Sequence, residues 1–344
     1  MTAVLIASPL GDELAGRIAA VDERIELLYD PAVVPVARFM GDIAGDFDPD
    51  PERWTGLLAR AEVIFGVPNG SAQGLVDAVR GGPEVRWIQA RNAGAGQQVA
   101  GALELDRGAL ERVAVTTASG VHAGPLAEFA LLGLLAFAKR LPRMQRDKAR
   151  RHWPAQEQPS GELRDQTLLV VGAGAIGAEI ARLGRAFGMH VLGVKRDVSE
   201  PVEHVDELHP VAALHELAGR ADAIVSVLPG TEATTGLLDA ALFAAVKPGA
   251  VFVNVGRGTV VDEDALIAAL RDGSLAGAAL DVFAQEPLPP ASPLWELENV
   301  IISPHDTARV ASEEARQVEL FCDNLRRYLA GEELRNRVDL ELLY

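Results

Sequence analysis

Short apolar runs alternate with amphipathic or turn-rich stretches in the N-terminal part of the chain. The runs are AVLIAS (3–8), RIELLYD (24–30), AEVIFGV (61–67) and EVRWIQA (84–90). They are rich in β-branched and aromatic residues, which favour strands, and helical or turn-rich segments separate them. Strands joined by such crossover segments predict a parallel sheet with helices on its faces.

A second and sharper series occupies the later part of the chain. Strands are predicted at TLLVVGAG (167–174), HVLGV (190–194), ADAIVSVL (221–228), AVFVNVG (250–256), 277–283 and NVIIS (299–303). Helices are predicted over 176–187, 211–219, 239–249 and 262–274, between these strands. This alternation is typical of a doubly wound, Rossmann-like sheet, so we expect two parallel-sheet α/β domains.

Residues 124–141, between the two series, are apolar on nearly every face of a predicted helix. Such a helix must be covered all round, either by its own domain or by a second subunit. Large exposed apolar patches are rarely tolerated on a monomer, so the stretch 126–138 leads us to expect a homodimer. One more amphipathic helix is predicted over 312–329.

Composition and charge narrow the possible partners. The 344 residues carry 49 acidic and 32 basic side chains, a formal net charge of −17. Such a surface repels phosphate backbones and anionic lipid, so neither nucleic acid nor a membrane is an expected partner. The N-terminus has no basic region of a signal peptide, and the lone Cys322, in an amphipathic stretch, is expected to be a core residue. We expect a cytoplasmic protein.

A glycine-rich turn directly follows the predicted strand 167–174 and opens a helix. Its pattern is GxGxxG, and the expected binding residues are Gly172, Gly174, Ala175, Ile176 and Gly177. The first glycine allows a tight turn, the second lets the backbone approach a pyrophosphate, and the third lets the helix pack closely on the strand. The helix N-terminus adds NH groups and a positive dipole. The turn therefore predicts a dinucleotide site.

The residue after the second strand of such a unit usually selects the cofactor. An acid there binds the ribose 2′-OH of NAD and repels a 2′-phosphate. This chain has Lys195 and Arg196 at that position, two cations suited to the extra phosphate of NADP. The alternative is that both are solvated and that Asp197 takes the role of the acid. We predict NADP as the preferred cofactor, with NAD as the other possibility.

Three further motifs stand at predicted strand ends, where this fold places its ligands. They are VNVGRG with Arg257, DVFAQEP with Asp281 and Glu286, and NVIISPH with His305. Any one of these side chains alone is as typical of a solvated surface as of a site. Their arrangement at the ends of three strands of one unit indicates an active site.

These stretches make the chain resemble the D-isomer-specific 2-hydroxyacid dehydrogenase family, and its glyoxylate and hydroxypyruvate reductases in particular. The resemblance rests on VVGAGAIGAEIARLGRAFGM, VKPGAVFVNVGRGTVVDEDALIAAL, GAALDVFAQEPLP, SPLWELENVIISPH and NLRRYLAGEELRNRV. It extends from about residue 113 to the end. It is weaker before that point, where RNAGAGQQ (91–98) is similar to the loop that binds the substrate carboxylate.

The resemblance implies an NAD(P)-dependent oxidoreductase that acts on the CH–OH group of a small 2-hydroxy acid, or reduces the matching 2-oxo acid. Arg257 would bind the substrate, and His305 would be the acid/base, paired with Glu286. The residues implied to bind the substrate are Arg257, His305, Ala93, Gly94 and Ala95. The further residues implied to bind the cofactor are Leu228, Pro229, Asn254, Val255, Gly256, Asp281 and His305. Asp281 would face the nicotinamide carboxamide. No metal is expected.

The resemblance also implies a split architecture. A flavodoxin-like substrate domain would take residues 1–101 and 306–344, and the cofactor domain, 102–305, would be inserted into it.

Two departures from the family pattern concern substrate choice. The carboxylate loop continues as Gly96-Gln97 where relatives often have an acid, and His305 precedes Asp306-Thr307-Ala308-Arg309 where relatives usually have small or apolar residues. Asp306 and Arg309 are therefore expected to shape the pocket or to tune His305.

Two other functions share these features. A phosphite dehydrogenase would use the same Arg, Glu and His, and a nucleotide-sensing corepressor would use the same fold. The intact triad argues against the corepressor.

Overall fold

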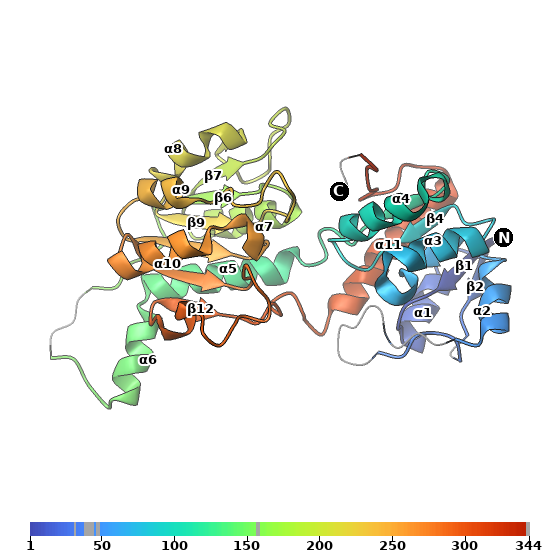
Figure 1. The fold of residues 1–344 in the computed structure, drawn as a ribbon, viewed down its shortest axis with the longest axis horizontal. Coiled ribbons are helices and arrows are strands. Elements are labelled where there is room, and N and C mark those ends of the chain that lie inside the picture. Colours follow the sequence, from blue (N-terminus) through green and yellow to red (C-terminus); the bar gives the residue numbers. More distant parts are fainter. Residues whose placement is uncertain (31, 38–44, 46–48, 156–158, 342–344) are drawn as a thin grey trace. The chain divides into compact units, whose positions relative to one another are not determined.

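The computed structural model describes residues 1–30, 32–37, 45, 49–155 and 159–341. The chain divides into two compact units (Figure 1): unit 1 is Met1–Val121 with Arg309–Tyr344, and unit 2 is His122–Ala308. Each unit holds one sheet, and the strand pairs described in both sheets are parallel. The predicted fold class is confirmed.

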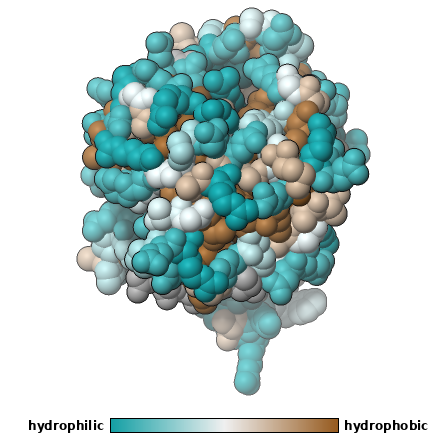
Figure 2. All heavy atoms as spheres, turned by 90° about the vertical axis from the view of Figure 1, so that its right-hand side faces the viewer, coloured by the Kyte–Doolittle hydropathy of each residue, from teal (hydrophilic) through white to brown (hydrophobic). Residues whose placement is uncertain are grey.

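Unit 1 contains a five-stranded sheet in the order β2-β1-β3-β4-β5, the flavodoxin-like order. Its strands are β1 (Thr2–Ile6), β2 (Ile25–Leu28), β3 (Val63–Phe65), β4 (Trp87–Gln89) and β5 (Ala114–Thr116). Its helices are α1 (Asp12–Ala19), α2 (Pro51–Leu58), α3 (Ala72–Gly81), α4 (Gly96–Leu110) and α11 (Glu313–Ala330), with a 3-10 turn, η1 (Pro68–Gly70). In the space-filling view of the chain (Figure 2), hydrophilic residues make up most of the visible face, with apolar patches between them.

The C-terminal helix α11 packs on the N-terminal sheet of unit 1. The ring of Phe321 lies 4.8 Å from that of Phe65 and 5.0 Å from that of Trp87, centroid to centroid. Cys322 is 6% exposed in the same core, and its burial raises the pKa of the thiol. Burial favours the neutral thiol over the nucleophilic thiolate, so Cys322 is a core residue as predicted. This packing explains why the end of the chain belongs to unit 1.

The boundaries between the units differ from those predicted. The expected junction at 101/102 falls inside α4, and the contacts instead divide the chain between Val121 and His122. The reason is β5, a strand that the sequence pattern did not indicate, which pairs with β4 and continues the first sheet. The second junction lies after Ala308, close to the predicted one at 305/306.

Unit 2 contains a seven-stranded sheet in the order β12-β11-β10-β9-β6-β7-β8. Its strands are β6 (Thr167–Val171), β7 (His190–Val194), β8 (Glu207–His209), β9 (Ala223–Ser226), β10 (Ala250–Asn254), β11 (Leu275–Leu280) and β12 (Val300–Ile302). Its helices are α5 (Ala123–Ala138), α6 (Leu141–Ala149), α7 (Ala175–Ala186), α8 (Leu214–Ala218), α9 (Ala240–Ala245) and α10 (Glu263–Asp272), with 3-10 turns η2 (Val211–Ala213), η3 (Gly258–Val260) and η4 (Pro293–Glu296). Strand order reverses between β6 and β9, the position at which such sheets bind dinucleotides.

The apolar helix α5 is covered by its own unit. Ala127, Ala130 and Leu134 are at most 1% exposed, and a Cβ at Gly133 would lie 2.6 Å from the Cβ of Ala279 in β11. Leu132 is the exposed large apolar side chain of this described helix, at 51%, whereas Leu126, Phe129 and Leu131 are buried. The apolar character of α5 therefore does not by itself require a second subunit.

No helix in the described ranges is long and apolar enough to span a membrane.

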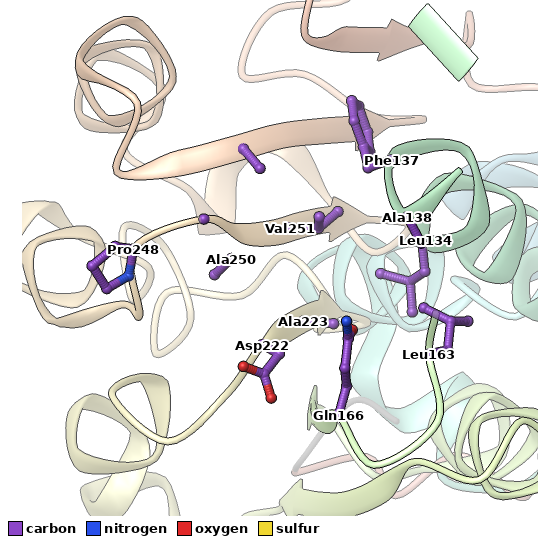
Figure 3. Close-up of a pocket in the computed structure, with 12 residues that line it drawn as sticks. Leu134, Phe137, Ala138, Leu163, Gln166, Asp222, Ala223, Pro248, Ala250 and Val251 are labelled. Atoms are coloured by element: carbon purple, nitrogen blue, oxygen red, sulfur yellow. The ribbon is translucent and has the colours of Figure 1, made fainter. Parts of the chain in front are cut away.

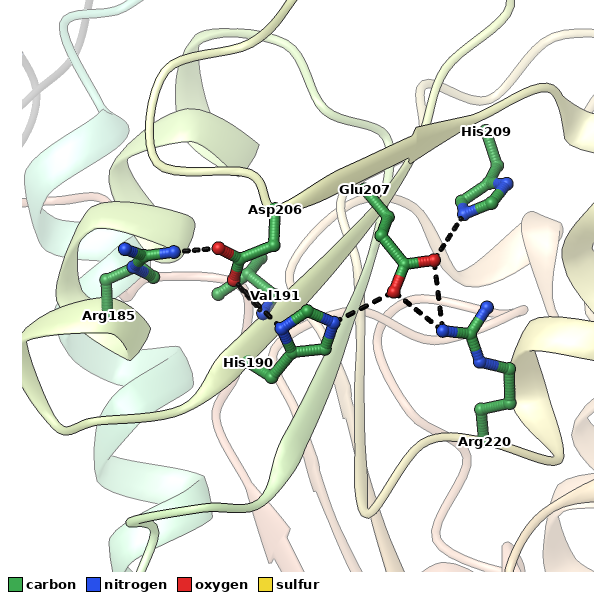
Figure 4. A network of polar contacts seen from close by, with 7 residues as sticks. All are labelled: Arg185, His190, Val191, Asp206, Glu207, His209 and Arg220. Atoms are coloured by element: carbon green, nitrogen blue, oxygen red, sulfur yellow. Dashed lines mark hydrogen bonds and ion pairs between the residues drawn. The ribbon is translucent and has the colours of Figure 1, made fainter.

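A polar network covers the β7–β8 edge of the unit 2 sheet (Figure 4). The Glu207 carboxylate accepts hydrogen bonds from Arg220 (2.7 Å) and contacts ring nitrogens of His190 (2.9 Å) and His209 (3.2 Å). Hydrogen bonds from Arg220, then from His190, lower the pKa of Glu207 to about 2. Asp206 pairs with Arg185 and accepts from the backbone NH of Val191, which fixes the segment before β8.

This network predicts how stability depends on pH. Because the pKa of Glu207 is lowered in the folded state, its charge stabilises the fold above its usual pKa of 4.5, and this stabilisation is lost as pH falls toward 2. At pH 6, Glu207→Gln should lower Tm by roughly 1–3 °C, because surface ion pairs contribute little. The difference from the unmodified chain should shrink between pH 4.5 and pH 3. Glu200→Gln, on an exposed turn, is the control. A Tm difference that stays constant over this pH range would contradict the assignment.

Candidate active site

The glycine turn lies where strand order reverses in unit 2. Gly172 follows β6 with φ +105°, and a Cβ there would lie 3.2 Å from the backbone of Val227 at the end of β9. A Cβ at Gly177 would come within 2.3 Å of the Gly172 carbonyl oxygen, so the start of α7 packs tightly on the turn. A Cβ at Gly174 would meet nothing within 4 Å, so this residue faces open space. The turn thus has one closely packed side and one open side, as a pyrophosphate cradle requires.

The other predicted residues of unit 2 lie at the same, carboxyl-terminal edge of the sheet. Lys195 and Arg196 follow β7, Leu228 and Pro229 follow β9, Val255, Gly256 and Arg257 follow β10 after its last residue Asn254, Asp281 follows β11, and His305 follows β12. Because all these strands are parallel and neighbouring, their ends form one row beside the glycine turn. Ala175 and Ile176 form the first turn of α7.

A cavity of about 180 Å³ lies at the opposite edge of this sheet (Figure 3). Gln166, Asp222 and Ala250 line it at the amino ends of β6, β9 and β10, together with the end of α5. Its carboxylate, Asp222, is already bonded to the NH of Thr167 (2.8 Å) and to the ammonium of Lys247 (3.0 Å). Because the cavity lies at the amino ends of the strands, it is separate from the row of predicted site residues at their carboxyl ends.

The two cations after β7 stand beside a carboxylate that is bonded elsewhere. Asp197 accepts a hydrogen bond from the backbone NH of Ser199 (2.9 Å). This bond, the Ser199 hydroxyl and the charges of Lys195 and Arg196 lower the pKa of Asp197. This hydrogen bond to Ser199 favours a role for Asp197 in shaping the turn after Arg196, rather than in binding a ribose.

Asn254 shapes the turn that presents Arg257. Its side chain is 1% exposed, accepts from the NH of Gly256 (3.1 Å) and donates to the carbonyl of Arg257 (3.1 Å). The next residue, Gly258, packs so closely that a Cβ would overlap the backbone of Phe283. The Arg257 side chain is exposed and, within the part of the chain that the structure describes, donates a hydrogen bond only to the neighbouring Gly256 carbonyl (2.8 Å). Its guanidinium therefore stays available for an anion.

His305 and Glu286 form a direct pair. The Nδ1 atom of His305 lies 2.7 Å from Oε2 of Glu286, and the side chains are 43% and 34% exposed. The other oxygen, Oε1, accepts from the NH of Phe283 (3.0 Å), which fixes the carboxylate. With Nδ1 held by Glu286, the second ring nitrogen, Nε2, is the atom that can exchange a proton with a bound substrate.

A buried polar cluster lies beside this pair. The Asp281 carboxylate is 1% exposed and accepts from the hydroxyl of Ser303 (2.8 Å) and the NH of Thr307 (3.3 Å). Two buried hydroxyls near these strand ends, Thr307 Oγ1 and Ser226 Oγ, have no hydrogen-bond partner in the part of the chain described. Sequence reasoning did not single out Ser226 or Ser303, and it noted Thr307 only as part of a departure. Unpaired buried hydroxyls of this kind suit a polar ligand group such as a carboxamide.

The predicted carboxylate loop lies in unit 1. Ala93, Gly94 and Ala95 follow β4 and lead into α4, whose first turn presents backbone NH groups. Ala93 and Gly94 are exposed and small, so an anion can approach this backbone. Arg91, before the loop, is buried and donates to Gln317 and Glu314 of α11, which anchors the start of the loop.

Known proteins are similar to this chain in sequence and fold. The sequence profile of "D-isomer specific 2-hydroxyacid dehydrogenase, NAD binding domain" matches residues 131–307. The chain belongs to this family. A glyoxylate reductase of Korarchaeum cryptofilum is 35% identical over 239 residues, 67% of this chain and 70% of that protein. A D-3-phosphoglycerate dehydrogenase of Methanocaldococcus jannaschii is 32% identical over 66% of this chain and 43% of its own length.

A solved structure extends the likeness to the whole chain. The D-isomer specific 2-hydroxyacid dehydrogenase of Xanthobacter autotrophicus Py2, crystallised with NADPH and MES, matches with a TM-score of 0.77 and 29% identity over 100% of this chain and 99% of that one. The chain is thus an NAD(P)-dependent oxidoreductase that acts on CH–OH groups, and the predicted family, enzyme class and cofactor type are confirmed.

Proposed function

We propose that this dehydrogenase reduces a small 2-oxo acid with NADPH and also catalyses the reverse oxidation. The observation that carries this proposal is the His305–Glu286 pair, 2.7 Å apart, at the end of β12 in the unit that holds the glycine turn. A histidine oriented by a carboxylate is suited to general acid/base catalysis. The nicotinamide cofactor, when bound, supplies or accepts the hydride.

The residues present fit such a cofactor. The open side of Gly174 and the N-terminus of α7 would bind the pyrophosphate, because NH groups and the helix dipole favour its negative charge. Leu228, Pro229, Val255 and Gly256 would line the groove at neighbouring strand ends. The unpaired Thr307 hydroxyl and Asp281 would meet the carboxamide. These groups hold and orient the cofactor.

The substrate carboxylate would be bound by Arg257 of unit 2, and the backbone NH groups of Ala93, Gly94 and Ala95 are a separate proposed anion-binding loop of unit 1. A guanidinium can bind a carboxylate through two parallel hydrogen bonds, which gives both attraction and orientation. In a chain of net charge −17, such a local cation is needed to attract an anionic substrate. Protonated His305 would then deliver a proton from Nε2 to the carbonyl oxygen, while Glu286 holds the ring through Nδ1.

A panel of substrates tests this function. The chain is assayed with glyoxylate, hydroxypyruvate, phenylpyruvate and a branched 2-oxo acid, each with NADPH and with NADH, by the loss of reduced-nicotinamide absorbance. We expect turnover of at least one oxo acid. Turnover of phosphite with oxidised cofactor and of no oxo acid would favour the phosphite alternative. Tight NADPH binding without any turnover would instead favour a sensor.

The preference for NADPH rests on the cations after β7. Replacing Lys195 with Asp should lower the ratio of kcat/KM for NADPH to that for NADH about tenfold or more, because a favourable charge becomes a repulsive one. Arg271→Asp, in the last turn of α10, makes the same charge change away from the β7 end and should leave the ratio unchanged. Equal use of both cofactors by the unmodified enzyme would refute the preference.

We also propose that the protein is a homodimer, with α6 in the contact. No residue of α6 is buried, and Met144 and the nearby Trp153 are 54% and 87% exposed. Exposed large apolar side chains are typical of interfaces. Light scattering should give about twice the chain mass of 36.5 kDa, and the double variant Met144→Glu/Trp153→Glu should shift it toward one chain. A single-chain mass for the unmodified protein at micromolar concentration would refute the dimer.

A further inference from the structure

Asp306 is linked to the site through one hydroxyl group. The Oγ atom of Ser303 lies 3.0 Å from Oδ1 of Asp306 and 2.8 Å from Oδ1 of Asp281. Ser303 is 7% exposed and Asp281 is 1% exposed, whereas Asp306 is exposed. A hydroxyl has one hydrogen, so Ser303 shares a single donated proton between two carboxylates. The three side chains form a chain of contacts from the interior to the surface.

These side-chain contacts hold the backbone on both sides of His305. The Ser303–Asp306 contact spans three residues and closes the loop in which His305 lies. On the far side of the histidine, the NH of Thr307 donates to the same Asp281 oxygen, so Asp281 binds the loop both before and after His305. His305 itself has φ +57°, in the left-handed region that non-glycine residues seldom adopt. A backbone in that region persists only when its surroundings hold it there.

We infer that Asp306 is a positioning residue for His305. It acts through Ser303 and Asp281 to hold the loop so that His305 Nδ1 meets Glu286. This inference rests on the proposed function, since it gives His305 the role of acid/base. The contact joins Ser303, in the segment NVIISPH, to Asp306, the residue directly after His305.

Substitutions separate positioning from simple structural support. Asp306→Ala removes the contact with Ser303, whereas Asp306→Asn keeps a side chain that can accept from the Ser303 hydroxyl or donate to it. We expect Asp306→Ala to lower kcat for oxo-acid reduction about tenfold, with KM and the Kd for NADPH changed less than about twofold. Asp306→Asn should restore most of kcat. Ser303→Ala should resemble Asp306→Ala. The control is Asp272→Ala, which removes an exposed carboxylate at the end of α10, before β11.

A readout independent of turnover uses the imidazole protons. In ¹⁵N-labelled protein, the Nδ1 proton of His305 should exchange slowly because Glu286 holds it, and His305→Ala identifies its signal among the 7 histidines. Asp306→Ala should broaden or abolish this signal and Asp306→Asn should retain it. These spectra test the positioning even if no oxo acid is turned over, so the two proposals can fail separately. An unchanged signal and unchanged kcat in Asp306→Ala would overturn the inference, as would equal losses in Asp306→Asn.

Discussion

Replacing His305 with alanine is expected to lower kcat for oxo-acid reduction on the order of a hundredfold or more, the usual contribution of a general acid. The Kd for NADPH should stay nearly unchanged, because the glycine turn follows β6 and His305 follows β12. The side chain is 43% exposed, so its loss should leave folding intact. Steady-state kinetics with a fluorescence titration of NADPH measure both quantities.

The control for this substitution is His215→Ala, an exposed histidine that also contacts a carboxylate, Asp239, at 3.1 Å. It should leave kcat unchanged. If His305→Ala keeps near-normal reduction, His305 is not the proton donor.

The same assignment predicts opposite pH profiles for the two directions. Reduction needs a charged imidazole and should fade as pH rises, while oxidation needs a neutral one and should improve. Because the Glu286 carboxylate, 2.7 Å away, orients the imidazole through Nδ1, Glu286→Gln should lower kcat for reduction. Its effect on kcat should be milder than that of His305→Ala. Profiles that run in parallel for both directions would contradict the acid/base role.

Replacing Arg257 with alanine is expected to raise KM for the oxo acid on the order of a hundredfold, because a hydrogen bond between charged partners is lost. The Arg257 side chain is exposed, and its Nη1 donates a hydrogen bond to the neighbouring Gly256 carbonyl, so its removal should destabilise the fold little. The Kd for NADPH should change far less than KM. Initial rates over a range of oxo-acid concentrations give the comparison.

Two further variants sharpen this result. Arg257→Lys keeps the charge without the planar fork and should recover only part of the affinity. Arg271→Ala, on α10, removes the same charge elsewhere and should leave KM unchanged. An unchanged KM in Arg257→Ala would exclude the guanidinium as the carboxylate partner.

Much of the fold could be predicted from the sequence, because most of its strands are buried and form continuous apolar runs. The strand at 167–171 and the helix from 175 matched the predicted strand, glycine turn and helix closely. The positions of Arg257, Asp281 and His305 at strand ends also followed, since each comes directly after an apolar run.

Other features could not be predicted, and the reasons are physical. The strand β8 has the sequence ELH and is only half-buried, so it does not form an apolar run, and β5 has the short sequence AVT with a polar last residue; missing β5 moved the predicted unit boundary. An apolar sequence shows that α5 must be covered but not by what, and the structure shows cover from its own unit. The Asp281–Ser303 contact joins residues 22 apart through a side-chain hydroxyl, which no local pattern reports.

The central claim is that hydride passes between the nicotinamide and carbon 2 of a 2-oxo acid. The direct measurement is a reaction of the unmodified enzyme with glyoxylate, or the best acid of the panel, and NADPH carrying deuterium at the transferable position of C4, followed by mass spectrometry of the product. We predict one deuterium at carbon 2 of the hydroxy acid for each NADPH oxidised. NADPH oxidation that leaves no deuterium in the hydroxy acid, or no product from any acid in the panel, would contradict this account.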